Sequence, residues 1–334
     1  MRPETVPAAA TADSGEPLLV WLGFGLFVVV MLVLDLKVFH KHPHEVKTKE
    51  ALGWSIFWIA LALLFNVGVY LWIDAEKAGE FLAAYLIEKS LSVDNLFVFI
   101  VLFDYFKIPG LLQHRVLFLG ILGAIVMRLA FILAGSALLH QFEWMMVVFG
   151  GFLVLTGIKL LFQKEGGGDP EKTIAVRLAR KMMPVTSEFH GTALTVMKDG
   201  VRHATPLLLV LIVIELTDVV FAVDSVPACL AVSTDPFIVF TSNIFAILGL
   251  RALYFLLARF LGSFHYLKIG LAVVLAFVGV KMSLPYFDKG WKIPIPVSLG
   301  VIGGVLLLAT AASLLVKPKA AAPHEPAAPP PPPQ

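Results

Sequence analysis

Apolar residues form long runs along this chain, and polar residues fall mainly in the short stretches between them. A transmembrane α-helix needs about 20 mostly apolar residues, and each run is long enough to cross a bilayer. The pattern predicts an all-α fold, a polytopic membrane protein with about nine transmembrane helices. The predicted spans lie near residues 18–38, 52–73, 80–104, 113–139, 143–162, 205–232, 236–258, 266–285 and 293–316.

Composition agrees with lipid as the main solvent. Of the 334 residues, 58% are hydrophobic and 15% are charged, whereas about a quarter of a soluble domain is charged. The net charge of +2, without a dense block of lysines and arginines, argues against nucleic acid as a partner. Cys229 is the only cysteine, which excludes an internal disulfide and a thiolate metal cluster.

Positively charged loops set the expected orientation. Lysines and arginines concentrate between the first two spans, between the third and fourth, and in the long loop 163–204. Cytoplasmic loops carry such an excess, so we expect these loops and the C-terminus inside and residues 1–17 outside as a short tail. Residues 18–316 would form one transmembrane transport domain. Residues 317–334 are rich in proline and alanine and predict a disordered cytosolic tail.

Two of the predicted spans share an acidic pattern. Residues 88–95 in the third span and 218–225 in the sixth both contain an acid, an aspartate six residues later, and then a small polar side chain. The spans that follow also match, because Gly120 precedes Arg128 by the same eight residues that separate Asn243 from Arg251. Two matches in the same order indicate an internal repeat.

By the expected topology the two copies run in opposite directions, which predicts an inverted repeat. Repeat A lies near residues 80–139 and repeat B near 205–258. Inverted repeats are typical of secondary transporters, whose ion site lies near mid-membrane between the repeats. The acidic spans are therefore the candidate halves of one cation site.

The geometry of a regular helix limits how these acids can meet. Antiparallel packing of the two spans would place Glu88 level with Asp224. It would likewise place Asp94 level with Asp218. Six residues correspond to 600° of rotation, so the two acids of one helix point about 120° apart. Either each helix is locally unwound or each pair lines a broad polar wedge. Pro227 lacks an amide donor and predicts a helix break beside Asp224.

Acidic side chains inside apolar spans need a physical explanation. An ionised side chain facing lipid at mid-membrane costs about 2.5–3.5 kcal/mol, so these groups must be protonated, hydrated, paired or bound to a metal. Five acids and three cations leave an excess of two negative charges, which a divalent cation or two protons would cancel. The acids are Glu88, Asp94, Glu215, Asp218 and Asp224, and the cations are Lys89, Arg128 and Arg251.

The donor atoms favour a hard cation. Carboxylate, amide and hydroxyl oxygens are the ligands that Mn²⁺, Mg²⁺ and Ca²⁺ prefer, and no histidine lies at mid-depth in the spans. We therefore expect a transported metal ion and no permanently bound cofactor. The predicted metal ligands are Glu88, Asp94, Asn95, Asp218, Asp224 and Ser225. Predicted relay positions and counter-ions are Glu215, Lys89, Arg128 and Arg251.

Each polar group also has a structural interpretation. The acids could form a buried network of salt bridges and interhelical hydrogen bonds with no ion passing through it. His40, His42 and His44 could capture a metal on the cytosolic face, or they could form a solvated turn.

Three stretches of the sequence carry a family likeness: FLAAYLIEKSLSVDN at residues 81–95, ELTDVVFAVDSVP at 215–227 and TSNIFAILGLR at 241–251. They closely resemble the TerC/Alx family of bacterial membrane proteins, and the likeness extends from about Leu18 to Val316. The resemblance implies a protein of the bacterial inner membrane that is linked to tellurium-ion resistance. For Alx-like members it implies Mn²⁺ export, with a relationship to LysE-type exporters.

The resemblance also implies the protein-export machinery as a candidate partner, beside self-association and the lipid bilayer. We expect an exporter of a hard divalent cation, with Mn²⁺ as the first candidate, working by proton-coupled alternating access and not as an enzyme. The alternative is a non-transporting TerC-type scaffold or metal sensor in tellurium or metal stress. An intramembrane aspartyl protease fits less well, because the spans contain no Tyr-Asp or Gly-x-Gly-Asp motif.

Overall fold

The computed structural model describes residues 17–40, 48–162, 176–177, 184–186, 189–198, 200–258, 265–288 and 293–315. The chain divides into two compact units, residues 1–44 and 45–334. The first unit contains helix α1 (Leu18–His40), and every other element belongs to the second. His42, His44 and the side chain of His40 lie outside the described residues, as do the C-terminal tail and all but one residue of the N-terminal tail.

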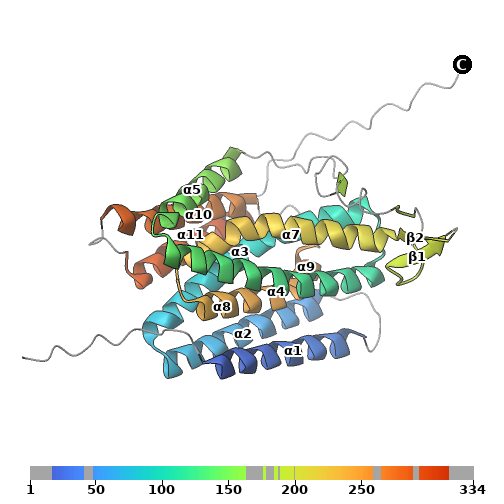
Figure 1. Ribbon diagram of the computed structural model, residues 1–334, viewed down its shortest axis with the longest axis horizontal. Helices are drawn as coiled ribbons and strands as arrows, with labels where there is room; N and C mark the ends of the chain where they lie inside the picture. The colour runs from blue at the N-terminus through green and yellow to red at the C-terminus, as the bar shows by residue number, and fades with distance from the viewer. Residues whose placement is uncertain are drawn as a thin grey trace, which may run out of the picture. The chain divides into compact units, whose positions relative to one another are not determined.

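The second unit is built from helices (Figure 1). Polar residues set their ends: Asp74 caps α3 by accepting a hydrogen bond from the amide of Lys77, and Asp235 caps α8, where Pro236 takes the first position. The helices are α2 (Thr48–Trp72), α3 (Ala75–Tyr105), α4 (Gly110–Gln141), α5 (Met145–Phe162), α7 (Pro206–Leu230), α8 (Pro236–Leu248), α9 (Leu250–Leu257), α10 (His265–Phe287) and α11 (Ile295–Leu315).

The predicted polytopic, helical membrane architecture is confirmed, whereas the count of nine spans is not. Within the described residues seven helices are long and apolar enough to cross a bilayer, namely α1, α2, α4, α5, α7, α10 and α11. The pair α8 and α9, bent by 42° at Gly249, would make an eighth if it crosses as one span. Helix α3 does not meet the same criterion, because Glu88, Lys89 and Asp94 interrupt its apolar middle.

Helix packing in the second unit brings segments distant in the sequence together. Helix α5 packs chiefly against α10, α4 against α7, and α3 against α8. The α5–α10 contact is backbone to backbone, because a Cβ atom on Gly150 would lie 2.5 Å from the carbonyl oxygen of Gly279. The α4–α7 and α3–α8 contacts each join a helix of predicted repeat A to one of predicted repeat B, whereas α5 and α10 are the helices that follow the two repeats in the sequence. The inverted repeat itself stays a prediction.

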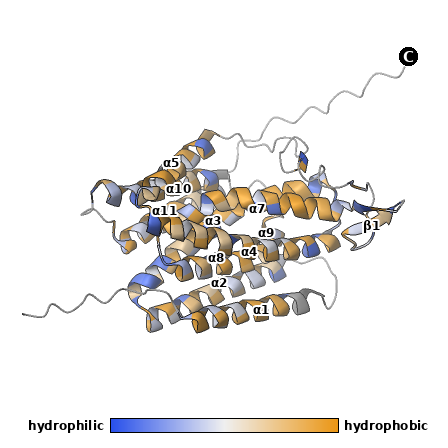
Figure 2. Cartoon of the chain, viewed as in Figure 1, coloured by the Kyte–Doolittle hydropathy of each residue, from blue (hydrophilic) through white to orange (hydrophobic). Residues whose placement is uncertain are grey.

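A short β-hairpin, which hydrophobic periodicity did not predict, lies within the loop 163–204. Strands β1 (Thr195–Lys198) and β2 (Val201–Ala204) pair antiparallel, and Gly200 adopts the left-handed φ of 75° that the turn requires. The hydroxyl of Thr205 donates to the carbonyl of Ala193 at 2.8 Å, which fixes the hairpin to the start of α7 (Figure 1). Figure 2 shows hydrophobic residues along most of α7 and more hydrophilic residues on β1.

The predicted helix break at Pro227 is wrong. Helix α7 runs without interruption from Pro206 to Leu230, with Pro227 inside its last turn. A proline this near the end removes one backbone hydrogen bond and leaves no following helix to disrupt, so the helix tolerates it. The interruption occurs instead between α8 and α9, where the chain bends at Gly249.

Candidate functional site

A guanidinium group lies at the buried centre of the second unit. Arg128 of α4 has no exposed surface, and its Nη1 donates to a carboxylate oxygen of Glu88 on α3, which is also fully buried. Its Nη2 pairs with Oδ1 of Asp218 on α7 at 3.4 Å. One arginine therefore bridges two acids that correspond to each other in the predicted repeat.

Two neutral side chains complete a group that we call the Arg128 cluster, formed by Glu88, Arg128, Asp218, Ser225 and Asn243. Arg128 Nη1 also lies 2.9 Å from Oδ1 of Asn243 on α8 and 3.2 Å from Oγ of Ser225 on α7. The amide nitrogen of Asn243 donates in turn to the second carboxylate oxygen of Glu88 at 3.0 Å. Four helices thus contribute polar side chains to one buried point.

Charge in the Arg128 cluster is not balanced. With all three groups ionised, Glu88, Asp218 and Arg128 sum to one net negative charge. Burying ions is costly, and hydrogen bonds to their remaining lone pairs offset that cost. Among the described residues, however, Oδ2 of Asp218 and Nε of Arg128 are buried and have no hydrogen-bond partner. The cluster therefore has unused capacity for a proton, a water molecule or a cation.

Asp224 lies apart from the Arg128 cluster. Its Oδ1 accepts a hydrogen bond from the hydroxyl of Thr156 on α5 at 3.2 Å. Asp218 and Asp224 therefore point to different neighbouring helices, as the 120° offset on a regular helix requires. The structure pairs Glu88 with Asp218 through Arg128, in place of the predicted level partner Asp224.

The remaining predicted ligands are Asn95 and Asp94, both on α3. Asn95 is buried in α3, one residue beyond Asp94. Asp94 belongs to the same helix, but its side chain lies outside the described part of the structure. Among the side chains that are described, no group of three or more histidines, cysteines, aspartates or glutamates is placed to hold a metal ion. Of the predicted ligands whose side chains are described, Glu88, Asp218 and Ser225 come together, whereas Asp224 lies apart.

The three predicted relay positions and counter-ions other than Arg128 lie on α7, α3 and α9. Glu215, one turn before Asp218 on α7, places its carboxylate against Gly123 of α4. Lys89 donates to the carbonyl of Ala246 at 3.2 Å, near the end of α8. A lysine at this position satisfies a carbonyl that loses its helical partner where the chain bends, and it complements the negative end of the helix dipole. Arg251, in α9 just after the bend, is buried.

Three residues near the acids were not among the predicted site positions. Asn243 marked the start of the repeated eight-residue spacing and is one of the oxygen donors of the spans, but it was not among the predicted ligands, and no sequence signal showed that its amide would bind Glu88. Thr156 is an isolated polar residue in an apolar helix. Cys229 places its sulfur 3.9 Å from a carboxylate oxygen of Glu88. It lies one turn after Ser225 on α7, but its nearness to Glu88 depends on how α7 packs against α3, which the sequence does not show.

The two ends of α3 make different kinds of contact with neighbouring segments. Near its start, the ammonium of Lys77 pairs with Glu80 at 2.9 Å and with Asp235, before α8, at 3.5 Å. The hydroxyl of Ser233 donates to Glu80 at 2.6 Å. Near the other end, an aromatic residue of α3 packs edge-on against Tyr254, whose hydroxyl donates to a glutamine of α4 at 3.0 Å. One end is thus held by ion pairs and the other by aromatic and neutral polar contacts.

Comparison with known proteins identifies the family. Residues 73–321 match the family described as integral membrane protein TerC family. An uncharacterised membrane protein of Myxococcus xanthus is 52% identical over 303 residues, covering 91% of this chain and 92% of the relative. No solved structure matches the chain.

Two further relatives carry the name "Putative membrane-bound redox modulator Alx". The protein from Salmonella typhi is 50% identical over 302 residues, which cover 87% of this chain and 92% of the relative. The protein from Escherichia coli strain K12 is 48% identical over 304 residues, which cover 88% and 93%. The family match covers most of the chain and these relatives align nearly end to end, so the chain belongs to the TerC family of integral membrane proteins.

Proposed function

We propose that this protein exports a hard divalent cation, with Mn²⁺ as the first candidate, across the bacterial inner membrane by alternating access. The observation that carries the proposal is the Arg128 cluster. Carboxylates from two helices, Glu88 and Asp218, converge with the side-chain oxygens of Ser225 and Asn243 at a buried point. Ionisable groups held inside a membrane protein typically mark an ion pathway.

Arg128 would act in this cycle as a tethered counter-ion. Its guanidinium takes up the space between Glu88 and Asp218, where it offsets one of their two negative charges. A divalent cation could take that space only when the arginine withdraws, because two positive groups beside each other would repel strongly in a medium of low dielectric constant. Cation binding and arginine release would thus be coupled, and release of the cation would draw the arginine back.

The oxygen donors support manganese, magnesium or calcium as the transported ion over softer metals. The cluster offers carboxylate, amide and hydroxyl oxygens, which suit hard cations. The sulfur of Cys229 lies against it, but a single thiol is a poor basis for a soft-metal site. Mn²⁺ is preferred among the hard cations because the chain resembles Alx-like proteins. Exchange for protons is the natural coupling, since the same carboxylates can bind either a metal or H⁺.

The bend between α8 and α9 supplies a second element that supports transport. Discontinuous helices near mid-membrane are characteristic of secondary transporters, whose freed backbone groups line the substrate path. Lys89, adjacent to Glu88 in α3, donates to a carbonyl of α8 near this bend. A movement of Glu88 would therefore also move Lys89, the next residue of α3, and with it the contact to the bend.

The experiment is Mn²⁺ flux in liposomes that contain the purified protein and an enclosed metal-sensitive dye. Loss of one charged ligand should weaken Mn²⁺ binding roughly tenfold or more, so Glu88→Gln and Asp218→Asn should shift the Mn²⁺ dependence of flux by that factor. The matched control is Asp104→Asn, an exposed acid near the end of the same helix as Glu88. Its flux should equal that of the unmodified protein.

Absence of Mn²⁺, Mg²⁺ and Ca²⁺ flux from the unmodified protein would overturn the proposal. Retained Mn²⁺ binding without flux would support the alternative, a membrane scaffold or metal sensor. A redox function of the kind that the relatives' name states would need an external electron carrier, because this chain contains one cysteine and so no dithiol pair.

A further inference from the structure

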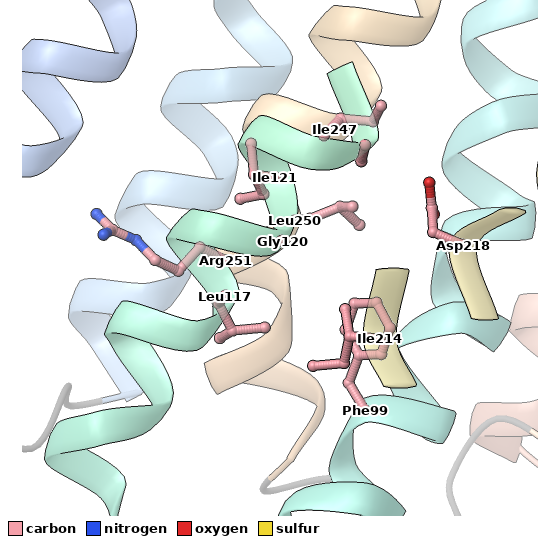
Figure 3. Close-up of a pocket in the computed structure, with 10 residues that line it drawn as sticks. Phe99, Leu117, Gly120, Ile121, Ile214, Asp218, Ile247, Leu250 and Arg251 are labelled. Atoms are coloured by element: carbon pink, nitrogen blue, oxygen red, sulfur yellow. The ribbon is translucent and has the colours of Figure 1, made fainter. Parts of the chain in front are cut away.

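A small cavity borders the Arg128 cluster on the side of Asp218. Its walls come from α3, α4, α7 and the α8–α9 pair, and they are mostly apolar. Figure 3 shows Asp218 on one side and Gly120, Leu250 and Ile247 on the other, with the guanidinium of Arg251 pointing away. The volume open to the centre of a water-sized sphere is about 20 Å³. That space suffices for one water molecule, which needs roughly 10–15 Å³ by this measure.

Asp218 gives the cavity an unused hydrogen-bond acceptor. Its Oδ1 is engaged by Arg128, whereas Oδ2 is buried without a partner among the residues that the structure describes. Only 6% of Asp218 is exposed. A buried carboxylate oxygen left unpaired costs free energy, and ordered water normally satisfies such an atom. The cavity also adjoins the bend at Gly249, because Ile247 and Leu250 flank it, and backbone groups at a bend can supply further partners.

The sequence repeat explains why the cavity lies on this side. In the predicted alignment Glu88 corresponds to Asp218, and Asn243 corresponds to Gly120. Around Glu88 the amide of Asn243 fills the space and donates to the carboxylate at 3.0 Å. Around Asp218 the acid is one methylene shorter and glycine stands where the asparagine would be. The missing amide leaves both a void and an acceptor without its donor.

We propose that this void is a binding site for one water molecule, which donates to Oδ2 of Asp218 and replaces the absent amide. Its role rests on the proposed function: the water lies between the Arg128 cluster and the α8–α9 bend, where a hard cation would exchange hydration water for protein oxygens. Mn²⁺ and Mg²⁺ prefer six oxygen ligands, and a water molecule at Asp218 would supply one that the protein does not. The two halves of the repeat would then differ: the amide of Asn243 donates to Glu88, whereas a water molecule donates to Asp218.

The test is X-ray radiolytic labelling of the purified protein in lipid nanodiscs, read by mass spectrometry. Bound water is activated in place and oxidises the side chains that touch it, so Phe99, Leu117 and Leu250 on the cavity walls should be labelled. Leu153 and Phe81, which are fully buried but do not line the cavity, should not be labelled and provide the internal control.

Filling the cavity should abolish the labelling. Gly120→Asn restores the amide that the other half carries, although its Cβ would lie 3.2 Å from Ile214 and that side chain must shift slightly. Ala124→Val fills the cavity from the next turn of the same helix and serves if the first variant does not fold. Gly151→Asn is the matched control, because nothing lies within 4 Å of a Cβ atom at Gly151. It should leave the labelling unchanged.

The outcomes separate this inference from the proposed function. Wall residues that are unlabelled in the unmodified protein, or labelled equally in Gly120→Asn, would overturn the water site whether or not Mn²⁺ is transported. A second outcome is that the unmodified protein is labelled, that Gly120→Asn is not, and that neither transports a cation. It would support the water site and count against the transporter. Labelling together with flux, both lost in Gly120→Asn, would support the water site and its role.

Discussion

Replacement of Arg128 by methionine should be the most destabilising change in the chain's polar interior. The substitution removes the cation that lies between Glu88 and Asp218 and leaves both carboxylates buried. Breaking a buried ion pair costs about 3–5 kcal/mol, and the stranded acceptor of Asn243 adds about 1–3 kcal/mol. The expected loss is therefore about 4–8 kcal/mol, a large part of a typical unfolding free energy of about 5–15 kcal/mol.

Neutralising the two acids should reverse most of that loss. In the triple variant Arg128→Met, Glu88→Gln and Asp218→Asn, the Arg128 cluster contains no charged group, and methionine fills much of the arginine's volume. Buried ion pairs replaced as a unit are often neutral in stability, so the triple variant should lie within about 2 kcal/mol of the unmodified protein.

The assay is SDS-driven unfolding in mixed micelles, which yields an unfolding free energy for membrane proteins. Arg115→Met is the control, because Arg115 is exposed in the same helix and its loss should change stability by less than about 0.5 kcal/mol. The reasoning fails if Arg128→Met unfolds like the unmodified protein, or if the triple variant is less stable than the single one.

Three further substitutions test other parts of the structure by the same unfolding measurement. Tyr254→Phe removes the 3.0 Å hydrogen bond to Gln113 and should cost about 0.5–1.5 kcal/mol, and an unchanged value would show that this bond does not form. Gly150→Ala should cost about 1–3 kcal/mol because α5 and α10 must separate, whereas Gly151→Ala meets nothing and should cost far less; equal losses would contradict the close packing. Asp224→Asn keeps the acceptor oxygen that binds the hydroxyl of α5, so it should change stability by less than about 1 kcal/mol, and a loss as large as that at Arg128 would contradict its separate position.

The sequence predicted the helices well because their signal is local. Apolar runs end where polar residues begin, and α2, α5, α7 and α10 start within a few residues of the predicted spans. The bend at Gly249 carried no such signal, since that glycine lies in the apolar stretch 244–250, inside a single predicted span. The two strands of the hairpin were also missed, because four residues are too few to show an alternation of apolar and polar positions.

Four of the five members of the Arg128 cluster were among the predicted site residues, but the pairing of the acids was not predicted. Glu88, Asp218, Ser225 and Arg128 were identified because charged or polar side chains inside apolar spans need partners. Which acid meets which depends on helix depth, and the prediction counted depth from a span starting near residue 80. Helix α3 begins at Ala75, so the register moves by about five residues, or about 7 Å, and such an offset is enough to exchange partners.

The single thiol of the chain lies beside the cluster, and this has a practical consequence. Cys229 is fully buried, 3.9 Å from Glu88, and the sequence contains no other cysteine. A membrane-impermeant maleimide can therefore modify only this atom, and only in a conformation that opens the cluster to water. The unmodified protein thus carries its own reporter of opening. The labelling rate from each side of the membrane would measure which face opens. The same rates with and without Mn²⁺ would show how the cation shifts the protein between conformations open to either side.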